Sequence, residues 1–303
     1  MDVNLDSWDI DFTLETKTSL SDFRGADSLV LSGGGMKGIY LLGAIEYLHD
    51  AVGFDHLNAY YGVSIGAIIC SLLLVGYSPI EIMAQICVNK IQQKISVIDK
   101  HVIERKSLFN PQIFLRLFEE MITVKYGSVP TLKELYEKTG KDLYITTVCL
   151  SSPTSPIYLH HATHPDLSLS TAAQMSMSIP FLFGYTVYEE KKYMDGGFLD
   201  NFPIHYASQR SRRPFGISLQ SSGYTESSSF LGEVFFVITL PISYITEENK
   251  KNCPPHVCFI NLDTGEDAIS TVSFDRQNDA VYEMFAKGYH GCKNQLITKV
   301  KKD

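Results

Sequence analysis

Positive charge is scarce in this chain of 303 residues. Lysine and arginine number 26 against 34 aspartates and glutamates, so the net charge is −8. This balance argues against nucleic acid as a main partner, because phosphate binding requires a basic field on the protein. A transient membrane surface stays open as a partner, since a local basic patch or the insertion of apolar side chains is sufficient there.

Membrane-spanning and secretory segments are not indicated either. The uncharged run over residues 234–246 is 13 residues long and contains Pro241, whereas a spanning helix needs ~20 apolar residues. The N-terminus has no basic region followed by an apolar core, which a secretory signal would show. We therefore expect a cytoplasmic protein that associates with membranes peripherally. The run itself fits a core or substrate-covering helix, or an edge that faces lipid.

Cysteine is infrequent as well, with six residues scattered along the chain. Without a secretory signal, free thiols are the better interpretation. Neither an internal repeat nor a long linker divides the sequence, although its length would also allow two smaller domains. We expect a polar arm over residues 1–26, with an excess of acidic side chains, and a single domain over residues 27–303.

The pattern Gly-x-Ser-x-Gly occurs at residues 62–66. A short aromatic run precedes it and an apolar run with the length of a buried helix follows it. In such a strand–turn–helix elbow, Ser64 sits above a helix N-terminus, where free N–H groups favour a developing anion. Gly62 and Gly66 remove side chains that would collide with neighbouring backbone. The alternative is a plain glycine-flanked turn with a surface serine.

A glycine-rich loop joins the first predicted strand, residues 28–32, to a helical apolar pattern. Its sequence is Gly33-Gly34-Gly35-Met36-Lys37-Gly38. It matches the Gly-x-Gly-x-x-Gly pattern of dinucleotide loops, but such a site needs a next strand that ends in an acidic residue. The next strand ends in the serine elbow instead. Bare glycine N–H groups can also point at one oxygen atom, which favours an oxyanion hole. A structural glycine turn is the third interpretation.

A carboxylate followed by two glycines ends the second strand of a predicted hairpin, as Asp195-Gly196-Gly197. A simple turn would explain the three residues. Strand ends of a parallel sheet converge on one edge, so Asp195 could also reach Ser64 and act as its base. The chain order equally permits a Ser-Asp-His triad, in which the histidine would be His205, His256 or His290.

Three histidines, His160, His161 and His164, cluster near Asp166 and invite a metal hypothesis. Side chains at 160 and 161 should point to opposite faces of a strand that we expect over residues 157–161. We therefore interpret the cluster as surface and core histidines and expect no metal site.

The three motifs in this order resemble the patatin-like phospholipase family. Residues 173–180 and 194–203 also look like that family's segment around its catalytic aspartate, and a weaker similarity extends over residues 274–295. The resemblance implies an α/β fold, a three-layer α/β/α sandwich with a central, mostly parallel sheet. It also implies hydrolysis of fatty acyl esters of phospholipids or other acyl lipids, without a metal or cofactor.

The family's roles transfer to this chain by motif. Ser64 would be the nucleophile and Asp195 its base. The elbow would comprise Gly62, Val63, Ile65 and Gly66, and the base motif Gly196 and Gly197. The oxyanion hole would be drawn from Gly33, Gly34, Gly35, Met36, Lys37 and Gly38. Lys37 stands where arginine is usual in the family, which keeps the charge but loses the planar fork. A conventional triad esterase and a non-catalytic lipid- or nucleotide-binding module remain the alternatives.

Overall fold

A single eight-stranded sheet forms the centre of the computed structural model, which describes residues 18–89, 107–220, 230–265 and 278–297. The strand order is β5-β6-β3-β2-β1-β7-β8, and β4 pairs with β3 off this path. Strands β3, β2, β1, β7 and β8 run parallel, whereas β4, β5 and β6 join antiparallel. The strands are β1 (Ser28–Leu31), β2 (Ala59–Val63), β3 (Asp142–Cys149), β4 (Ile157–Leu159), β5 (Thr186–Tyr188), β6 (Lys191–Asp195), β7 (Pro214–Gln220) and β8 (Cys258–Asp263).

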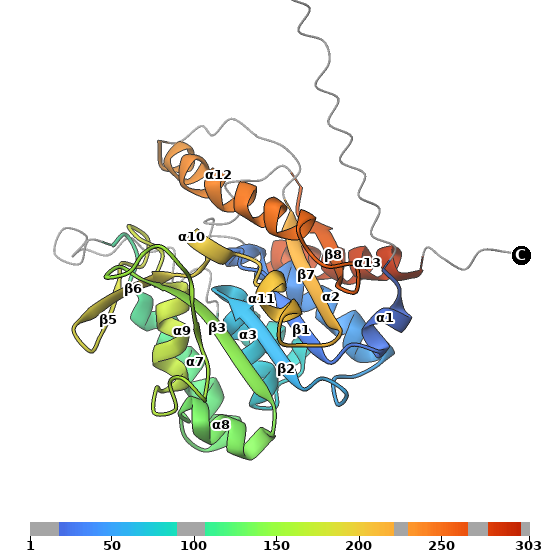
Figure 1. The fold of residues 1–303 in the computed structure, drawn as a ribbon, viewed down its shortest axis with the longest axis horizontal. Coiled ribbons are helices and arrows are strands. Elements are labelled where there is room, and N and C mark those ends of the chain that lie inside the picture. Colours follow the sequence, from blue (N-terminus) through green and yellow to red (C-terminus); the bar gives the residue numbers. More distant parts are fainter. Residues whose placement is uncertain (1–17, 90–106, 221–229, 266–277, 298–303) are drawn as a thin grey trace, which may run out of the picture.

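Helices cover both faces of this sheet (Figure 1). The larger core lies under α2, α3, α4, α7, α9 and α13, and the smaller core lies under the short helix α11 and Phe202 before it. The helices are α1 (Leu20–Arg24), the 3₁₀ helix η1 (Gly35–Lys37), α2 (Gly38–Ala51), α3 (Ile65–Leu74), α4 (Pro79–Val88), α7 (Pro111–Tyr126), α8 (Leu132–Thr139), α9 (Leu169–Met177), α10 (Gly197–Asp200), α11 (Ile204–Ser208), α12 (Phe230–Lys251) and α13 (Asn278–Ile297).

The central strands are apolar on both faces, as expected when helices cover both sides. In β1, Leu29 and Leu31 belong to the larger core, while Val30 between them belongs to the smaller one. All four residues of β1 and all five of β2 are buried. The predicted three-layer α/β/α architecture with a mostly parallel sheet is therefore confirmed.

The predicted polar arm does not hold over residues 18–26. Phe23 in α1 is fully buried and makes edge-on ring contacts with Phe54 and Phe215. The Thr18 hydroxyl donates to the Phe259 carbonyl of β8 at 3.0 Å. A single buried aromatic ring thus fixes this polar segment to the sheet. Residues 1–17 lie outside the described residues.

Helices α2 and α13 are packed unusually close together, although α13 lies near the end of the chain. A Cβ on Gly43 would lie 1.9 Å from the Phe285 carbonyl oxygen, and one on Gly288 would lie 2.1 Å from the Tyr40 carbonyl oxygen. Only glycine permits this backbone approach from both sides. The contact involves Tyr40 and Gly43, which lie in the first two turns of α2, close to the glycine loop.

The uncharged run over residues 234–246 lies within α12, which continues through Pro241. Among the described residues, no single helix has both the length and the apolar composition of a membrane span. The pair α3 and α4 would qualify by length and composition only as a bent unit, with 116° between the two helices.

Candidate active site

Three loops meet where the strands end, and each carries one of the motifs. The first leads from β1 into η1, the second from β2 into α3, and the third from β6 into α10. Ser64 occupies the second loop with φ 54° and ψ −125°, a conformation that costs a non-glycine residue energy. A Cβ on Gly66 would lie 2.6 Å from the Ser32 carbonyl oxygen, so the elbow can pack against β1 only with glycine there.

Ser176, which the sequence motifs do not single out, holds this elbow in place. The Ser64 N–H donates to the Ser176 hydroxyl at 2.8 Å, and that hydroxyl donates to the Thr146 carbonyl of β3 at 2.7 Å. Ser176 is fully buried on α9, so both hydrogen bonds form away from water. The elbow is therefore connected to the neighbouring strand through one side chain.

Asp195 ends β6 and is 4% exposed. Its Oδ1 accepts the Gly197 N–H at 2.7 Å. Its Oδ2 is buried and makes no hydrogen bond of standard geometry within the described part of the chain. Burial raises the pKa of Asp195 to about 6, and the nearby Ser64 hydroxyl and the Gly197 amide partly offset this rise. The carboxylate is thus a stronger base than an exposed aspartate.

The glycine after Asp195 brings its loop against β3. A Cβ on Gly196 would lie 2.4 Å from the Thr146 carbonyl oxygen, which is the oxygen that also accepts from Ser176. Thr146 therefore lies between the serine elbow and the aspartate loop. The two loops share one rigid support, which fixes the distance between the serine and the carboxylate.

The six amides of the glycine loop are not equivalent. The Gly33 N–H donates to the Asn201 carbonyl at 3.0 Å, and the Lys37 N–H donates to the Gly34 carbonyl at 3.0 Å. The Gly38 N–H bonds back to the carbonyls of η1. The amides that have no backbone acceptor among the described residues are those of Gly34, Gly35 and Met36. These amides are the ones free to bind a developing oxyanion.

An apolar pocket opens beside Ser64, between α2, α3, α4 and α7. Its empty volume is about 1010 Å³ with its open mouth included, and among the described residues that line it Ser64 has the only polar side chain. Ile68 of α3, Ile82 of α4 and Phe118 of α7 are among the residues that line it. A pocket without polar partners suits a hydrocarbon chain rather than a nucleotide.

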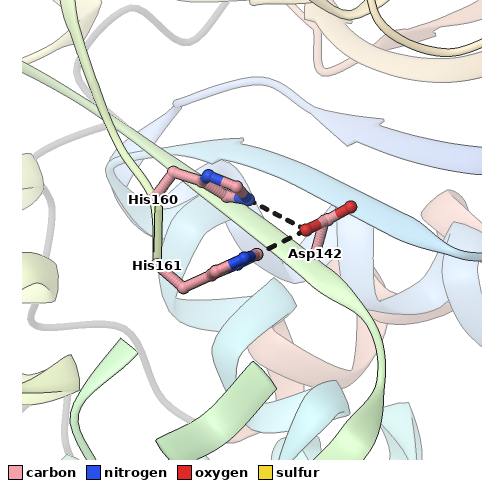
Figure 2. Close-up of side chains that lie close together, drawn as sticks. All are labelled: Asp142, His160 and His161. Atoms are coloured by element: carbon pink, nitrogen blue, oxygen red, sulfur yellow. Dashed lines mark hydrogen bonds and ion pairs between the residues drawn. The ribbon is translucent and has the colours of Figure 1, made fainter. Parts of the chain in front are cut away.

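The histidines considered for a triad lie elsewhere. His205, His256 and His290 are exposed, and no described histidine lines the pocket or hydrogen-bonds Ser64 or Asp195. The interpretation of His160 and His161 was wrong in its geometry. Strand β4 ends at Leu159, so strand alternation does not govern these two residues, and both side chains reach Asp142 (Figure 2).

The sequence was compared with protein-family models and with known proteins. The model of the family described as patatin-like phospholipase matches residues 29–208. The probable lipid hydrolase 463L of Invertebrate iridescent virus 6 is 35% identical over 186 residues, which are 59% of this chain and 62% of that protein. The chain thus matches less than two thirds of that relative. The uncharacterized protein R571 of Acanthamoeba polyphaga mimivirus is 24% identical over 286 residues, 89% of this chain and 93% of R571.

The fold also has a counterpart among solved structures. VipD from Legionella pneumophila superposes with a TM-score of 0.56 at 17% identity, over 90% of this chain and 67% of VipD. This likeness supports the fold alone. The family match covers more than half of the chain and includes the glycine loop, the serine elbow and Asp195. The chain therefore belongs to the patatin-like phospholipase family.

Proposed function

We propose that this protein is a phospholipase A-like lipid acyl hydrolase that cleaves fatty acyl esters with Ser64 and Asp195. One observation carries the proposal: Ser64 lies on a strained elbow, next to a buried carboxylate and at an otherwise apolar pocket. A serine needs a proton acceptor to attack an ester. The pocket would hold the acyl chain, and its mouth would admit the rest of the lipid.

The proposed reaction uses an acyl-enzyme intermediate. The Ser64 oxygen attacks the ester carbonyl while its proton passes to the Asp195 carboxylate, and the amides of Gly34, Gly35 and Met36 stabilise the oxyanion. Asp195 then returns the proton to the leaving alcohol as the carbon–oxygen bond breaks. A water molecule, deprotonated by Asp195, attacks the acyl-enzyme, and the proton returns to Ser64 as the fatty acid leaves.

Two structural arguments favour the dyad over a triad or a binding module. Burial already raises the pKa of Asp195 to about 6, toward the range in which a general base works well near neutral pH. The exposed position of His205 keeps it out of the pocket, whereas a triad would need a histidine between the serine and the aspartate.

We also propose that residues 27–303 act as one catalytic domain that meets lipid at a transient membrane surface.

The test compares Ser64→Ala, Asp195→Asn and His205→Gln on one defined phospholipid. We expect the first two variants to lose on the order of 10⁴-fold or more of kcat, because members of a catalytic set act as a unit. His205→Gln is the matched control and should stay close to wild type. Wild type and His205→Gln should also react covalently with a fluorophosphonate at Ser64, which requires an activated serine.

Two results would contradict the proposal. If one histidine substitution abolishes hydrolysis as fully as Ser64→Ala in a folded protein, a triad replaces the dyad. If wild type neither hydrolyses any member of a phospholipid panel nor reacts with the fluorophosphonate, the pocket only binds its ligand.

A further inference from the structure

A second polar cluster lies at the opposite end of the central strands, away from Ser64. Asp142 begins β3 and pairs with Ala59, the first residue of β2, whereas Ser64 follows the last residue of β2. The Asp142 Oδ1 lies 2.9 Å from the His160 Nε2 and 3.4 Å from the His161 Nδ1. Figure 2 shows both imidazoles directed at the same carboxylate.

Aromatic rings fix the orientation of both histidines. His160 stacks on Tyr144 with ring centroids 4.1 Å apart and an interplanar angle of 1°. His161 stacks on Tyr136 with centroids 3.7 Å apart and an angle of 16°. The side chains of Asp142, His160 and His161 are 35%, 11% and 20% exposed, so the cluster is ordered by its surroundings but still reachable from solvent.

The nitrogen of His161 that faces Asp142 has no better partner. His161 Nδ1 is buried and makes no hydrogen bond of standard geometry within the described residues. This nitrogen thus faces the Asp142 carboxylate at 3.4 Å without a hydrogen bond of standard geometry. An unpaired buried polar atom is costly unless something binds it.

We propose that Asp142, His160 and His161 bind a divalent transition-metal cation of the zinc type. Two imidazole nitrogens and one carboxylate oxygen form a donor set that suits zinc and its neighbours, while magnesium and calcium prefer oxygen alone. Bonds of ~2.0–2.2 Å in tetrahedral geometry separate ligand atoms by roughly 3.4 Å. The 2.9 and 3.4 Å separations around Asp142 Oδ1 are close to this value. Water would complete the coordination.

Binding of the cation would change the hydrogen bonds of the His160 ring. The Ala162 N–H donates to the His160 Nδ1 at 3.3 Å, which places the ring hydrogen on Nε2, where it is donated to Asp142. When Nε2 binds the cation, that hydrogen moves to Nδ1 and the Ala162 contact opens. The hydrogen bond from Nε2 to Asp142 is lost as well, because Nε2 now binds the cation. The site thus gains the cation in exchange for both hydrogen bonds of the His160 ring.

The proposed cation is structural and goes beyond the hydrolase function. It would join the start of β3 to the residues just after β4, two strands that pair antiparallel. Five residue steps, from Ala59 to Ser64, separate this end of the strands from Ser64 by ~17 Å at ~3.3 Å per residue. Hydrolysis should therefore not depend on the cation, and Ser64→Ala should still bind it.

The site is tested by titrating the full chain, without a histidine tag, with ZnCl₂ in an isothermal titration calorimeter. We expect one equivalent to bind to wild type. His161→Gln and Asp142→Asn should weaken binding by more than ~10²-fold, because even loss of an outer partner costs ~10–100-fold. His164→Gln is the matched control: its Nδ1 contacts the Thr163 hydroxyl rather than Asp142, and its affinity should equal that of wild type.

Cobalt(II) separates this site from the thiols, of which Cys253 and Cys258 are partly exposed. The wild-type cobalt complex should show d–d absorption without a sulfur-to-cobalt charge-transfer band, and zinc should raise the melting temperature of wild type. The proposal is overturned if wild type binds no zinc, if His161→Gln binds it as tightly as wild type, or if the cobalt spectrum shows sulfur ligation.

Discussion

Polar groups at the two ends of strands β2 and β3 have opposite surroundings. At the carboxyl edge, Ser64 is strained, and the Asp195 carboxylate is fully buried with one oxygen lacking a standard hydrogen bond. At the amino edge, Asp142 faces two imidazoles that aromatic rings hold in place. The first arrangement raises the energy of the charged Asp195 carboxylate, whereas the second brings Asp142 within hydrogen-bond distance of the His160 ring. The two clusters lie at opposite ends of β2.

The support at Thr146 gives the largest expected effect. In Gly196→Ala the new Cβ would meet the Thr146 carbonyl oxygen at 2.4 Å, and backbone cannot move aside cheaply. The Asp195 carboxylate should shift, and kcat should fall by about 10²-fold or more, since a displacement of ~1 Å has this effect.

Gly291→Ala, on α13, is the matched control. Its Cβ would lie 3.5 Å from the end of the Leu262 side chain, which is an ordinary contact distance. We expect less than about a tenfold loss, with melting temperatures checking that both variants fold. Equal losses in the two variants would show that the close approach to Thr146 does not position the base.

Helix α12 offers a second way to sharpen the comparison, because it packs on α10 at the carboxyl edge. Val237, Leu240 and Tyr244 are exposed along it. Each buried apolar side chain is worth ~1.5–3 kcal/mol, so Val237→Asp with Leu240→Asp should reduce hydrolysis of vesicles about tenfold or more. Hydrolysis of a soluble short-chain ester should be nearly unchanged. Equal losses on both substrates would mean that α12 only stabilises the fold.

The pH profile tests the electrostatic half of the comparison. Because burial raises the pKa of Asp195 to about 6, kcat/KM should rise about tenfold per pH unit below that value and level off above it. Asp200 is a second buried acid, and its carboxylate accepts a hydrogen bond from Tyr158. Burial also raises the pKa of Asp200 to about 6. Asp200→Asn should leave the midpoint in place. If the midpoint moves with Asp200 instead, Asp195 is not the titrating base.

The smallest expected effect concerns stability. The folded protein holds the Asp195 proton more tightly than the unfolded chain, so this stabilisation is present below pH ~4 and is lost as the pH rises through about 6. Asp195→Asn carries no charge and should be more stable than wild type at pH 7, by on the order of 3 kcal/mol. Denaturant melts at pH 7 and pH 4 check this, because the advantage should vanish at pH 4.

The sequence predicts the elements that local rules govern. The glycines that permit tight turns and the apolar strands can both be recognised in the sequence. The support of the site was not predictable, because Ser176 is merely a small polar residue on a helix until α9 packs against β3. The end of β4 at Leu159 was equally hidden, and it decides where His160 and His161 point. Tertiary packing overrides periodicity at such ends.

The close crossing of α2 and α13 has a consequence for where this protein could be cut. The family match ends at residue 208, yet α13 begins only at Asn278. Through Gly43 and Gly288, α13 covers the helix that follows the glycine loop, and β7 flanks β1 on the side away from β2. A fragment made of the matched residues alone would expose this apolar helix and leave one side of β1 unpaired. The matched residues therefore contain all three motifs but are not an excisable unit, because the helix after the glycine loop is supported by α13.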